Sequence, residues 1–181
     1  MRLTRPDYSL FLMNERTAGG LFPPEEEAMK LLANAPAHAS TEPTIAGFRI
    51  AAGQASPYFT TDPGTMNSDL HDARVLVARS PIDRWQSLVP ILEAIAKHAV
   101  PMLIVAPEIA RETLAFLVAN KLRGILAITV VESSDVDAIA AELGCKVHEV
   151  LDDLTVDDLG RVKRVVCGAK SSVLVSGRER L

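Results

Sequence analysis

The apolar positions of the chain alternate between short continuous runs and longer stretches with helical spacing. Continuous runs, typical of strands buried on both faces, occupy residues 74–78, 102–106 and 125–131. Helical spacing links them, over residues 80–98 after the first run and 108–123 after the second. This alternation predicts a layered α/β domain whose parallel strands are joined by right-handed crossover connections.

Capping and turn residues predict where these elements begin and end. Ser80 and Pro81 favour a helix start, and Gly124 should end the second helix. A third helix is predicted over residues 135–143, with Gly144 as its C-cap. The remaining predicted elements are a strand at 146–150, a helical turn at 155–158 and an antiparallel hairpin of 162–167 with 172–175.

The first 45 residues differ from the rest, so we expect an N-terminal extension (1–45) and one domain (46–181). Residues 8–13 favour a short strand or an apolar anchor. A short helix is predicted over 24–33, because three glutamates follow its initial proline where the helix dipole favours negative charge. Residues 35–44 are mostly small, include two prolines and predict a linker.

Two predicted helices carry more apolar surface than a helix on a sheet needs. In the helix that ends near His98, apolar positions cover about 180° of the circumference, against somewhat over 100° for an ordinary surface helix. Pro90 lies in its interior and should kink it. In the helix before Gly124, apolar side chains fall on nearly every side. Such a helix is either buried all round, which spacing alone favours, or part of an exposed binding surface.

Composition narrows the classes of function. The chain has 181 residues, 48% of them hydrophobic, which is enough for one domain with a core. A net charge of −4 and an aromatic content of 4% argue against a nucleic-acid partner. No apolar run approaches the roughly 18–20 residues that span a bilayer, and residues 10–13 are too few for a signal-peptide core. We therefore expect a cytoplasmic protein without a membrane partner.

The sequence contains none of the common motifs for catalysis or cofactor binding that we searched for. Neither GxGxxG nor GxxxxGK[ST] occurs, and the histidines lack metal-ligand spacing. Cys145 and Cys167 form no CxxC pair and are expected to be reduced and buried. Ser56 with Asp69 and His71 imitates a nucleophilic cluster, but no GxSxG elbow surrounds the serine. We expect no enzymatic activity, no cofactor and no metal.

Four segments occur in a specific order along the chain. They are residues 53–59 (GQASPYF), 92–97 (LEAIAK), 123–125 (RGI) and 154–166 (LTVDDLGRVKRVV). Together they resemble the apical, polypeptide-binding domain of the GroEL-type (group I) chaperonins, over about residues 47–177. The resemblance implies the apical-domain fold, with mixed sheets, parallel βαβ units and two exposed helices that form a groove. The equatorial ATPase and its phosphate loop have no counterpart here, which implies a stand-alone domain that works without ATP.

In that family, the groove between the two helices binds non-native polypeptide and the co-chaperonin, together with a nearby aromatic segment. The resemblance implies these site residues: Tyr58 and Phe59 in the aromatic segment, Val89, Leu92 and Glu93 on the first helix, and Leu114, Val118, Ala119 and Asn120 on the second. The apolar surplus of both helices falls on these positions, which favours the exposed arrangement. Gln54 and Ala55 stand where the family has an aromatic residue and a leucine, so one part of the groove is trimmed.

The resemblance therefore implies a chaperone-like protein that binds unfolded polypeptides. The alternative is a dedicated adaptor or assembly factor that holds one partner, such as a co-chaperonin or a chaperonin subunit, with residues 1–45 selecting it. An enzyme on an α/β scaffold is a third hypothesis, which a polar pocket at the carboxyl ends of the strands would support. The sequence leaves open whether the N-terminal helix fills the groove in cis.

Overall fold

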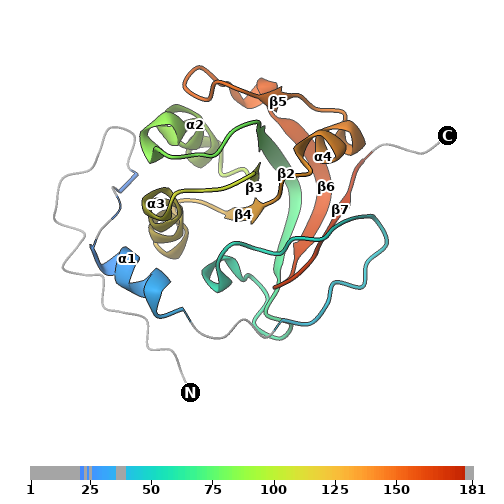
Figure 1. Ribbon diagram of the computed structural model, residues 1–181, viewed down its shortest axis with the longest axis horizontal. Coiled ribbons are helices and arrows are strands. Elements are labelled where there is room, and N and C mark those ends of the chain that lie inside the picture. The colour runs from blue at the N-terminus through green and yellow to red at the C-terminus, as the bar shows by residue number, and fades with distance from the viewer. Residues whose placement is uncertain (1–20, 23, 25, 36–39, 178–181) are drawn as a thin grey trace.

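Strand β2 (Ser68–Ala78) lies inside the sheet and pairs with three strands that all follow it in the chain. Figure 1 shows the computed structural model, which describes residues 21–22, 24, 26–35 and 40–177. The sheet order is β1-β7-β6-β2-β3-β4, and the short strand β5 (Val147–His148) pairs parallel with the end of β2. The sheet is mixed, because β3 (Met102–Ala106) and β4 (Ile128–Glu132) run parallel to β2.

The other edge of the sheet is antiparallel. Strand β6 (Gly160–Cys167) pairs with nearly the whole length of β2, from Cys167 opposite Ser68 to Gly160 opposite Val75. Strand β7 (Ser172–Val175) returns along β6, and β1 (Phe48–Ile50) pairs with β7. The predicted hairpin at the end of the chain is confirmed, and so is the parallel arrangement of the three buried strands.

Helices cover both faces of this sheet (Figure 1). Helices α2 (Val89–His98) and α3 (Arg111–Leu122) lie on one face, and α4 (Val136–Leu143) lies on the other. Successive residues of a strand point to opposite faces. Accordingly, Leu76 and Ile104 join the core under α2 and α3, whereas Val75 and Leu103 join the core under α4. Short 3₁₀ helices complete the fold: η2 (Pro57–Phe59), η3 (Trp85–Leu88) and η4 (Val156–Asp158).

Two details of the predicted helix at residues 80–98 are wrong. Ser80 does not cap it, because η3 intervenes and α2 starts only at Val89. Pro90 therefore falls in the first turn of α2, where a missing N–H removes no intrahelical hydrogen bond. The predicted helix ends are correct: Gly144 is the C-cap of α4, and Gly124 directly follows Arg123, the C-cap of α3. Gly124 and Gly144 both adopt positive φ angles, of 75° and 62°.

The predicted N-terminal helix is present as α1 (Glu26–Ala33), and it packs against α3 (Figure 1). The predicted strand or anchor at residues 8–13 lies outside the described residues, as do positions 36–39 of the predicted linker. The end of that linker is attached to the domain. Ser40 Oγ accepts a hydrogen bond from the Ala169 N–H, 2.6 Å between N and O.

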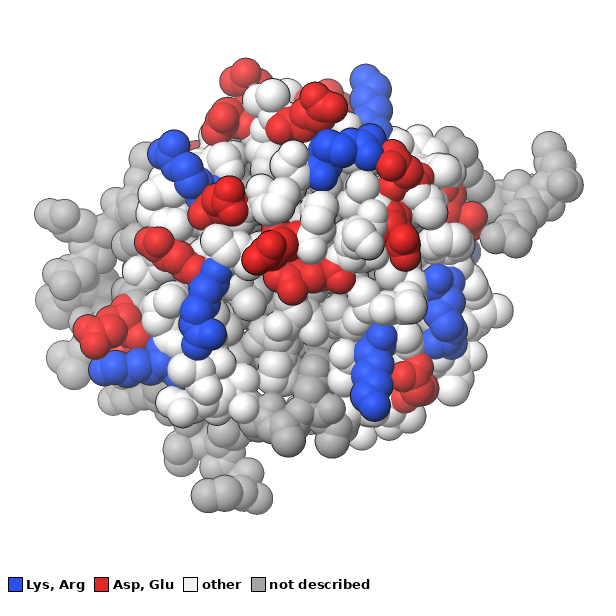
Figure 2. Space-filling view, in the orientation of Figure 1, with Lys and Arg blue, Asp and Glu red and all other residues white. Residues whose placement is uncertain are grey.

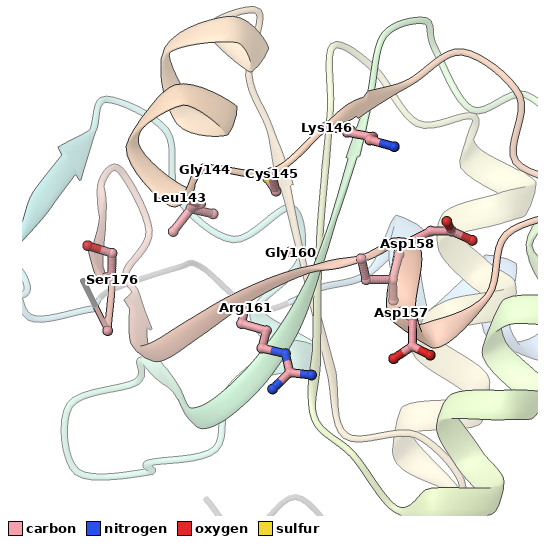
Figure 3. Close-up of a pocket in the computed structure, with 11 residues that line it drawn as sticks. Leu143, Gly144, Cys145, Lys146, Asp157, Asp158, Gly160, Arg161 and Ser176 are labelled. Carbon is pink, nitrogen blue, oxygen red and sulfur yellow. The ribbon is translucent and has the colours of Figure 1, made fainter.

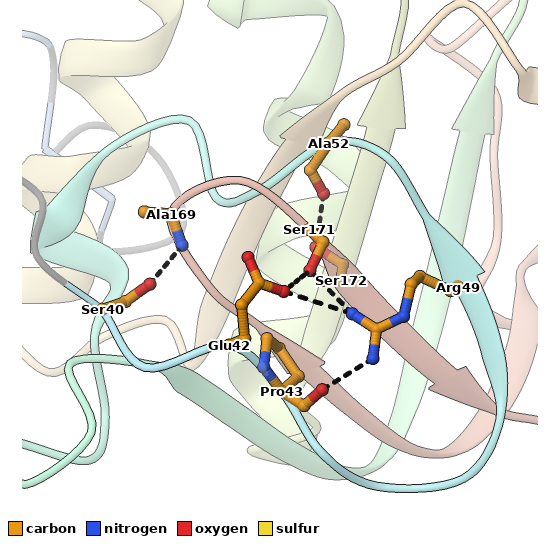
Figure 4. Close-up of polar contacts among 8 residues, drawn as sticks. All are labelled: Ser40, Glu42, Pro43, Arg49, Ala52, Ala169, Ser171 and Ser172. Atoms are coloured by element: carbon orange, nitrogen blue, oxygen red, sulfur yellow. Dashed lines mark hydrogen bonds and ion pairs between the residues drawn. The ribbon is translucent and has the colours of Figure 1, made fainter.

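Glu42 and Arg49 continue this attachment at the turn between β6 and β7 (Figure 4). The Ser171 hydroxyl donates to Glu42 Oε2 at 2.6 Å and accepts from Arg49 Nη1 at 2.9 Å. Arg49 Nη2 also donates to the Pro43 carbonyl at 2.7 Å. Residues 40–43 are thus fixed to the sheet edge by contacts from both main chain and side chains.

Candidate polypeptide-binding groove

The structure brings most of the predicted groove residues into one apolar cluster on the α2–α3 face of the sheet. Phe59, Leu92 and Val118 are buried members of this cluster, and the cluster also includes side chains of β2, β3 and β4. Tyr58, Val89 and Leu114 are partly buried and pack against it. Helix α3 also contacts both η2 and η3. The three predicted segments, an aromatic turn and two helices, are therefore neighbours in space.

The expectation that these side chains are exposed is wrong for several of them. Phe59, Leu92 and Val118 are fully buried, and Asn120 is as well. Leu92 packs in the core together with Ile91 and Ile95 of the same helix. Helix α3 has the arrangement that its spacing alone favoured, with apolar side chains buried on nearly all sides. The sequence pattern left open which part of the molecule covers α3, and the structure gives the answer.

The cover over α3 is supplied by residues 21–22, 24 and 26–33 of the same chain, which we call the N-terminal segment. Leu21 is only 1% exposed and belongs to the same buried cluster as Leu92 and Val118. Helix α1 follows it and lies beside α3, on the side of the helix layer away from α4 (Figure 1). The N-terminal segment thus occupies the α3 side of the surface where a bound polypeptide was predicted.

Asn120 binds the main chain of this segment. The Phe22 N–H donates to Asn120 Oδ1 at 2.9 Å, and Asn120 Nδ2 donates to the Phe22 carbonyl, also at 2.9 Å. Nδ2 further donates to the Phe116 carbonyl within α3, which orients the amide. The predicted rim residue therefore lies at the centre of the contact. Its buried amide is paired on both its oxygen and its nitrogen, as a buried polar group must be.

The side chain of Phe22 lies under a cation. The guanidinium carbon of Arg123 is 3.9 Å from the centre of the Phe22 ring, a cation–π geometry. Arg123 is the residue directly after α3, and Gly124 then turns the chain away. The sequence analysis did not assign Arg123, Leu21 or Phe22 to the site. For Leu21 and Phe22, the sequence offers one signal of a buried position: they form an apolar pair directly before two prolines. This pair belongs to no periodic pattern, so it predicts neither a helix nor a strand.

Helix α1 contributes a contact of small residues. Ala28 is buried against Ala115 and Ala119 of α3, with Met29 and Leu32 packed beside them. Alanine at all three positions lets the two helix backbones approach closely. Predicted site residue Ala119 is thereby covered, with 8% of its surface exposed.

The aromatic segment also contacts α1. The Tyr58 hydroxyl donates to the Leu31 carbonyl at 3.3 Å, and partial burial raises the pKa of Tyr58 above its usual value. Ser56 positions this tyrosine, because its Oγ accepts a hydrogen bond from the Tyr58 N–H at the N-cap of η2. Tyr58, Ala119 and Asn120 therefore all contact the N-terminal segment.

A further part of the groove is uncovered. It is an open depression along α2 that reaches the residues after α3, and predicted site residue Glu93 lines it. Glu93 and Lys97 give it a charged rim, and the partly exposed Ala96 and Ile125 give it an apolar floor. The face shown in Figure 2 carries acidic and basic side chains interspersed, without a continuous basic band.

A second depression lies far along the chain from this groove, between the end of α4 and the start of β6 (Figure 3). Its charged side chains do not converge, because Lys146, Arg161 and Asp157 point in different directions in the close-up. Asp158 is already used, since its Oδ2 accepts hydrogen bonds from the main-chain N–H and the hydroxyl of Thr155. The arrangement offers no common point for a substrate or ion.

The structure brings together only part of the residues considered as a nucleophilic cluster. His71 Nε2 lies 3.2 Å from Asp69 Oδ1, and Asp69 also forms an ion pair with Arg164 at 2.8 Å. Ser56 instead caps η2, as described above. The two cysteines form no disulfide: Cys167 is fully buried, which raises the pKa of its thiol to about 12, and Cys145 is partly buried. Within residues 21–22, 24, 26–35 and 40–177, no group of three or more histidine, cysteine or acidic residues could hold a metal ion.

None of the helices in the described part of the chain combines the length and the apolar character needed to cross a bilayer. Compared with models of known protein families, the chain matches none.

Proposed function

We propose that this protein binds extended apolar polypeptide segments, without ATP, at the groove formed by α2, α3 and the Tyr58–Phe59 turn. One observation carries the proposal: Asn120 holds Phe22 through two hydrogen bonds to main-chain atoms. Every polypeptide offers the same N–H and carbonyl, so this contact recognises a chain in extended form whatever its sequence. The resemblance to chaperonin apical domains supports the same site from an independent direction.

The side-chain contacts favour apolar clients. A buried aliphatic side chain such as Leu21 contributes about 1.5–3 kcal/mol, and each net hydrogen bond about 0.5–1.5 kcal/mol. An aromatic ring under a guanidinium adds about 0.5–2 kcal/mol. A free segment also loses translational and conformational entropy on binding, which offsets much of this sum. We therefore expect weak, reversible binding, which suits a protein that has no ATP cycle to release its client.

A dedicated adaptor is the second candidate, and Gln54 favours it. This side chain stands where the chaperonin family has an aromatic residue, and here its Nε2 donates to Thr60 Oγ1 and to the Met66 carbonyl. Gln54 thus holds the loop after η2 and supplies no apolar contact to a client. A groove that lacks this contact accepts a narrower set of segments.

The test uses the full chain with Leu21→Glu and Phe22→Glu, which we call the opened variant. These changes remove the buried Leu21 side chain and the Phe22 ring contact with Arg123, and a buried glutamate disfavours docking of the N-terminal segment. Its ligand is a fluorescent, acetylated peptide with the sequence of residues 21–33. Fluorescence anisotropy should give saturable binding at micromolar concentrations. The same peptide with glutamates at the positions of Leu21 and Phe22 should not bind.

Adding Asn120→Ala to the opened variant should weaken peptide binding about tenfold, since two main-chain hydrogen bonds are lost and about 1.4 kcal/mol corresponds to a factor of ten. If the opened variant keeps its circular dichroism spectrum and binds no peptide, the proposed function is wrong. If the opened variant does bind the peptide, light scattering distinguishes a general chaperone from a dedicated adaptor. A general chaperone suppresses aggregation of unrelated denatured clients without ATP, whereas an adaptor leaves that aggregation unchanged.

A further inference from the structure

We infer that the N-terminal segment is an intramolecular inhibitor that closes the groove in cis, so that a client must displace it. The inference rests on the proposed function of the groove. Three of the predicted site residues contact this segment: Asn120 through the main chain of Phe22, Ala119 through Ala28, and Tyr58 through the Leu31 carbonyl. The chain therefore presents to its own groove the contacts that a client would make.

The segment has two parts with different roles. The part before α1 inserts Leu21 into the buried cluster and places Phe22 between Asn120 and Arg123. The helical part, α1, lies on α3 through Ala28 and leaves Glu26, Glu27 and Lys30 exposed. Because the outer face of α1 is charged, the segment can cover an apolar groove and still present a polar surface to solvent.

The contacts of the segment are suited to displacement. Among the described residues of the segment, Leu21 is the one large side chain that is fully buried. Phe22, Met29, Leu31 and Leu32 are only partly buried. Helix α1 has eight residues, and a helix of that length is marginal in water once it leaves its packing partner. Elements held by few buried contacts open at the lowest cost in a structure. The segment is thus the part of this fold best able to detach while the sheet stays intact.

Covalent attachment gives the segment an advantage over any free client. A short covalent connection produces an effective concentration in the millimolar range. The apparent affinity for a client is reduced by the fraction of molecules that are open. A closed-to-open ratio between about 10 and 100 would therefore weaken client binding by about 10- to 100-fold. Removing the closure should restore the intrinsic affinity by the same factor.

The first test compares the wild-type chain with the opened variant, using the fluorescent peptide of residues 21–33. The opened variant should bind at least tenfold more tightly. A matched control, Thr41→Glu with Thr44→Glu, adds the same charge at exposed positions outside the N-terminal segment and should bind like the wild type. Equal affinities of wild type and opened variant would overturn the inference and leave the proposed function standing. Absence of binding by both would instead reject the proposed function.

The second test closes the groove reversibly. Ala28→Cys with Ala119→Cys places two thiols at the contact between α1 and α3, where both native side chains belong to one buried cluster. Oxidation should reduce peptide binding at least tenfold relative to the same variant in its reduced form, and a reductant should restore the binding of the reduced variant. Unchanged binding in a fully oxidised sample would overturn the inference. So would a dimer cross-linked through these cysteines, because the segment would then close the groove of another copy.

Discussion

Trp85 and Phe116 stack with ring centroids 4.7 Å apart and ring planes inclined by 26°. The pair joins η3, which leads into α2, to the middle of α3, and so fixes the two walls of the groove to each other. Trp85 is the single tryptophan of the chain, and its Nε1 is buried without a hydrogen-bond partner. Its fluorescence should therefore report on the spacing between these walls.

Replacing Phe116 by leucine should destabilise the protein and shift the Trp85 emission. The change removes an aromatic contact worth about 0.5–1.5 kcal/mol and leaves part of a fully buried volume empty, so we expect a loss of about 1–3 kcal/mol. Urea unfolding followed by circular dichroism measures the loss. Phe48→Leu, in the core on the opposite face of the sheet, should leave the emission wavelength of the folded protein unchanged.

Asn120→Ala in the otherwise wild-type chain should loosen the N-terminal segment. The Phe22 N–H and carbonyl lose their partner, while the Phe116 carbonyl still has its place in the helix. Two net hydrogen bonds of about 0.5–1.5 kcal/mol each predict roughly tenfold or greater acceleration of amide exchange in α1. Hydrogen-exchange mass spectrometry checks this, with Ser134→Ala, an exposed position far from α1 in the chain, as the control. Equal acceleration in β3 would mean global destabilisation and would contradict the prediction.

Asp69 should stabilise the fold in a pH-dependent way. The hydrogen bonds from Arg164 hold the pKa of this carboxyl below its usual value, so its stabilising effect is present above the unfolded-state pKa near 4. That effect disappears as the pH falls through the lower pKa of the folded state. Both side chains are partly exposed, which limits the contribution to below about 1 kcal/mol.

The measurement for Asp69 is the melting temperature of Asp69→Asn against wild type between pH 7 and pH 2. The variant should melt lower at pH 7, and the difference should shrink as the pH falls below about 4. Asp72→Asn is the matched control, because Asp72 is exposed and its positive φ of 51° is tolerated by asparagine. A difference for Asp69→Asn that persists to pH 2 would contradict the prediction.

Gly53→Ala should be among the most damaging single substitutions. A Cβ at this position would lie 2.3 Å from the carbonyl groups of Gly168 and Ala169, which are main-chain atoms and cannot turn aside. Overpacking of this kind costs about 1–3 kcal/mol, and the backbone contact places the change at the upper end. Thermal unfolding should show a clear loss, whereas Gly177→Ala, which meets nothing within 4 Å, should not.

The strand–helix alternation could be predicted because continuous apolar runs and helical spacing are local signals. The runs at 102–106 and 125–131 correspond to β3 and most of β4, and Gly144 ends α4 as its position implied. The helix start at Ser80 could not be predicted correctly. A capping signal is short, and packing of Trp85 on Phe116 fixes a 3₁₀ turn in its place.

For a different reason, the sequence could not predict whether the groove is covered by the chain itself or by a partner. An apolar surplus on α3 shows that something covers the helix, but the pattern is the same whether the cover is a partner or the chain itself. The cover depends on Leu21 and Ala28, one large and one small side chain in a short segment without its own periodic pattern. Only the tertiary structure relates that segment to Asn120.

The attachment of Ser40 and Glu42 to the turn between β6 and β7 sets the reach of a displaced N-terminal helix. Ala35 and Ser40 are separated by five residue steps, which span at most about 18 Å when fully extended. A helix released from α3 would therefore remain tethered within a few helix diameters of its docking place. Recapture would then be a local, first-order event that is independent of protein concentration, and its rate would set how long the groove stays accessible after each opening.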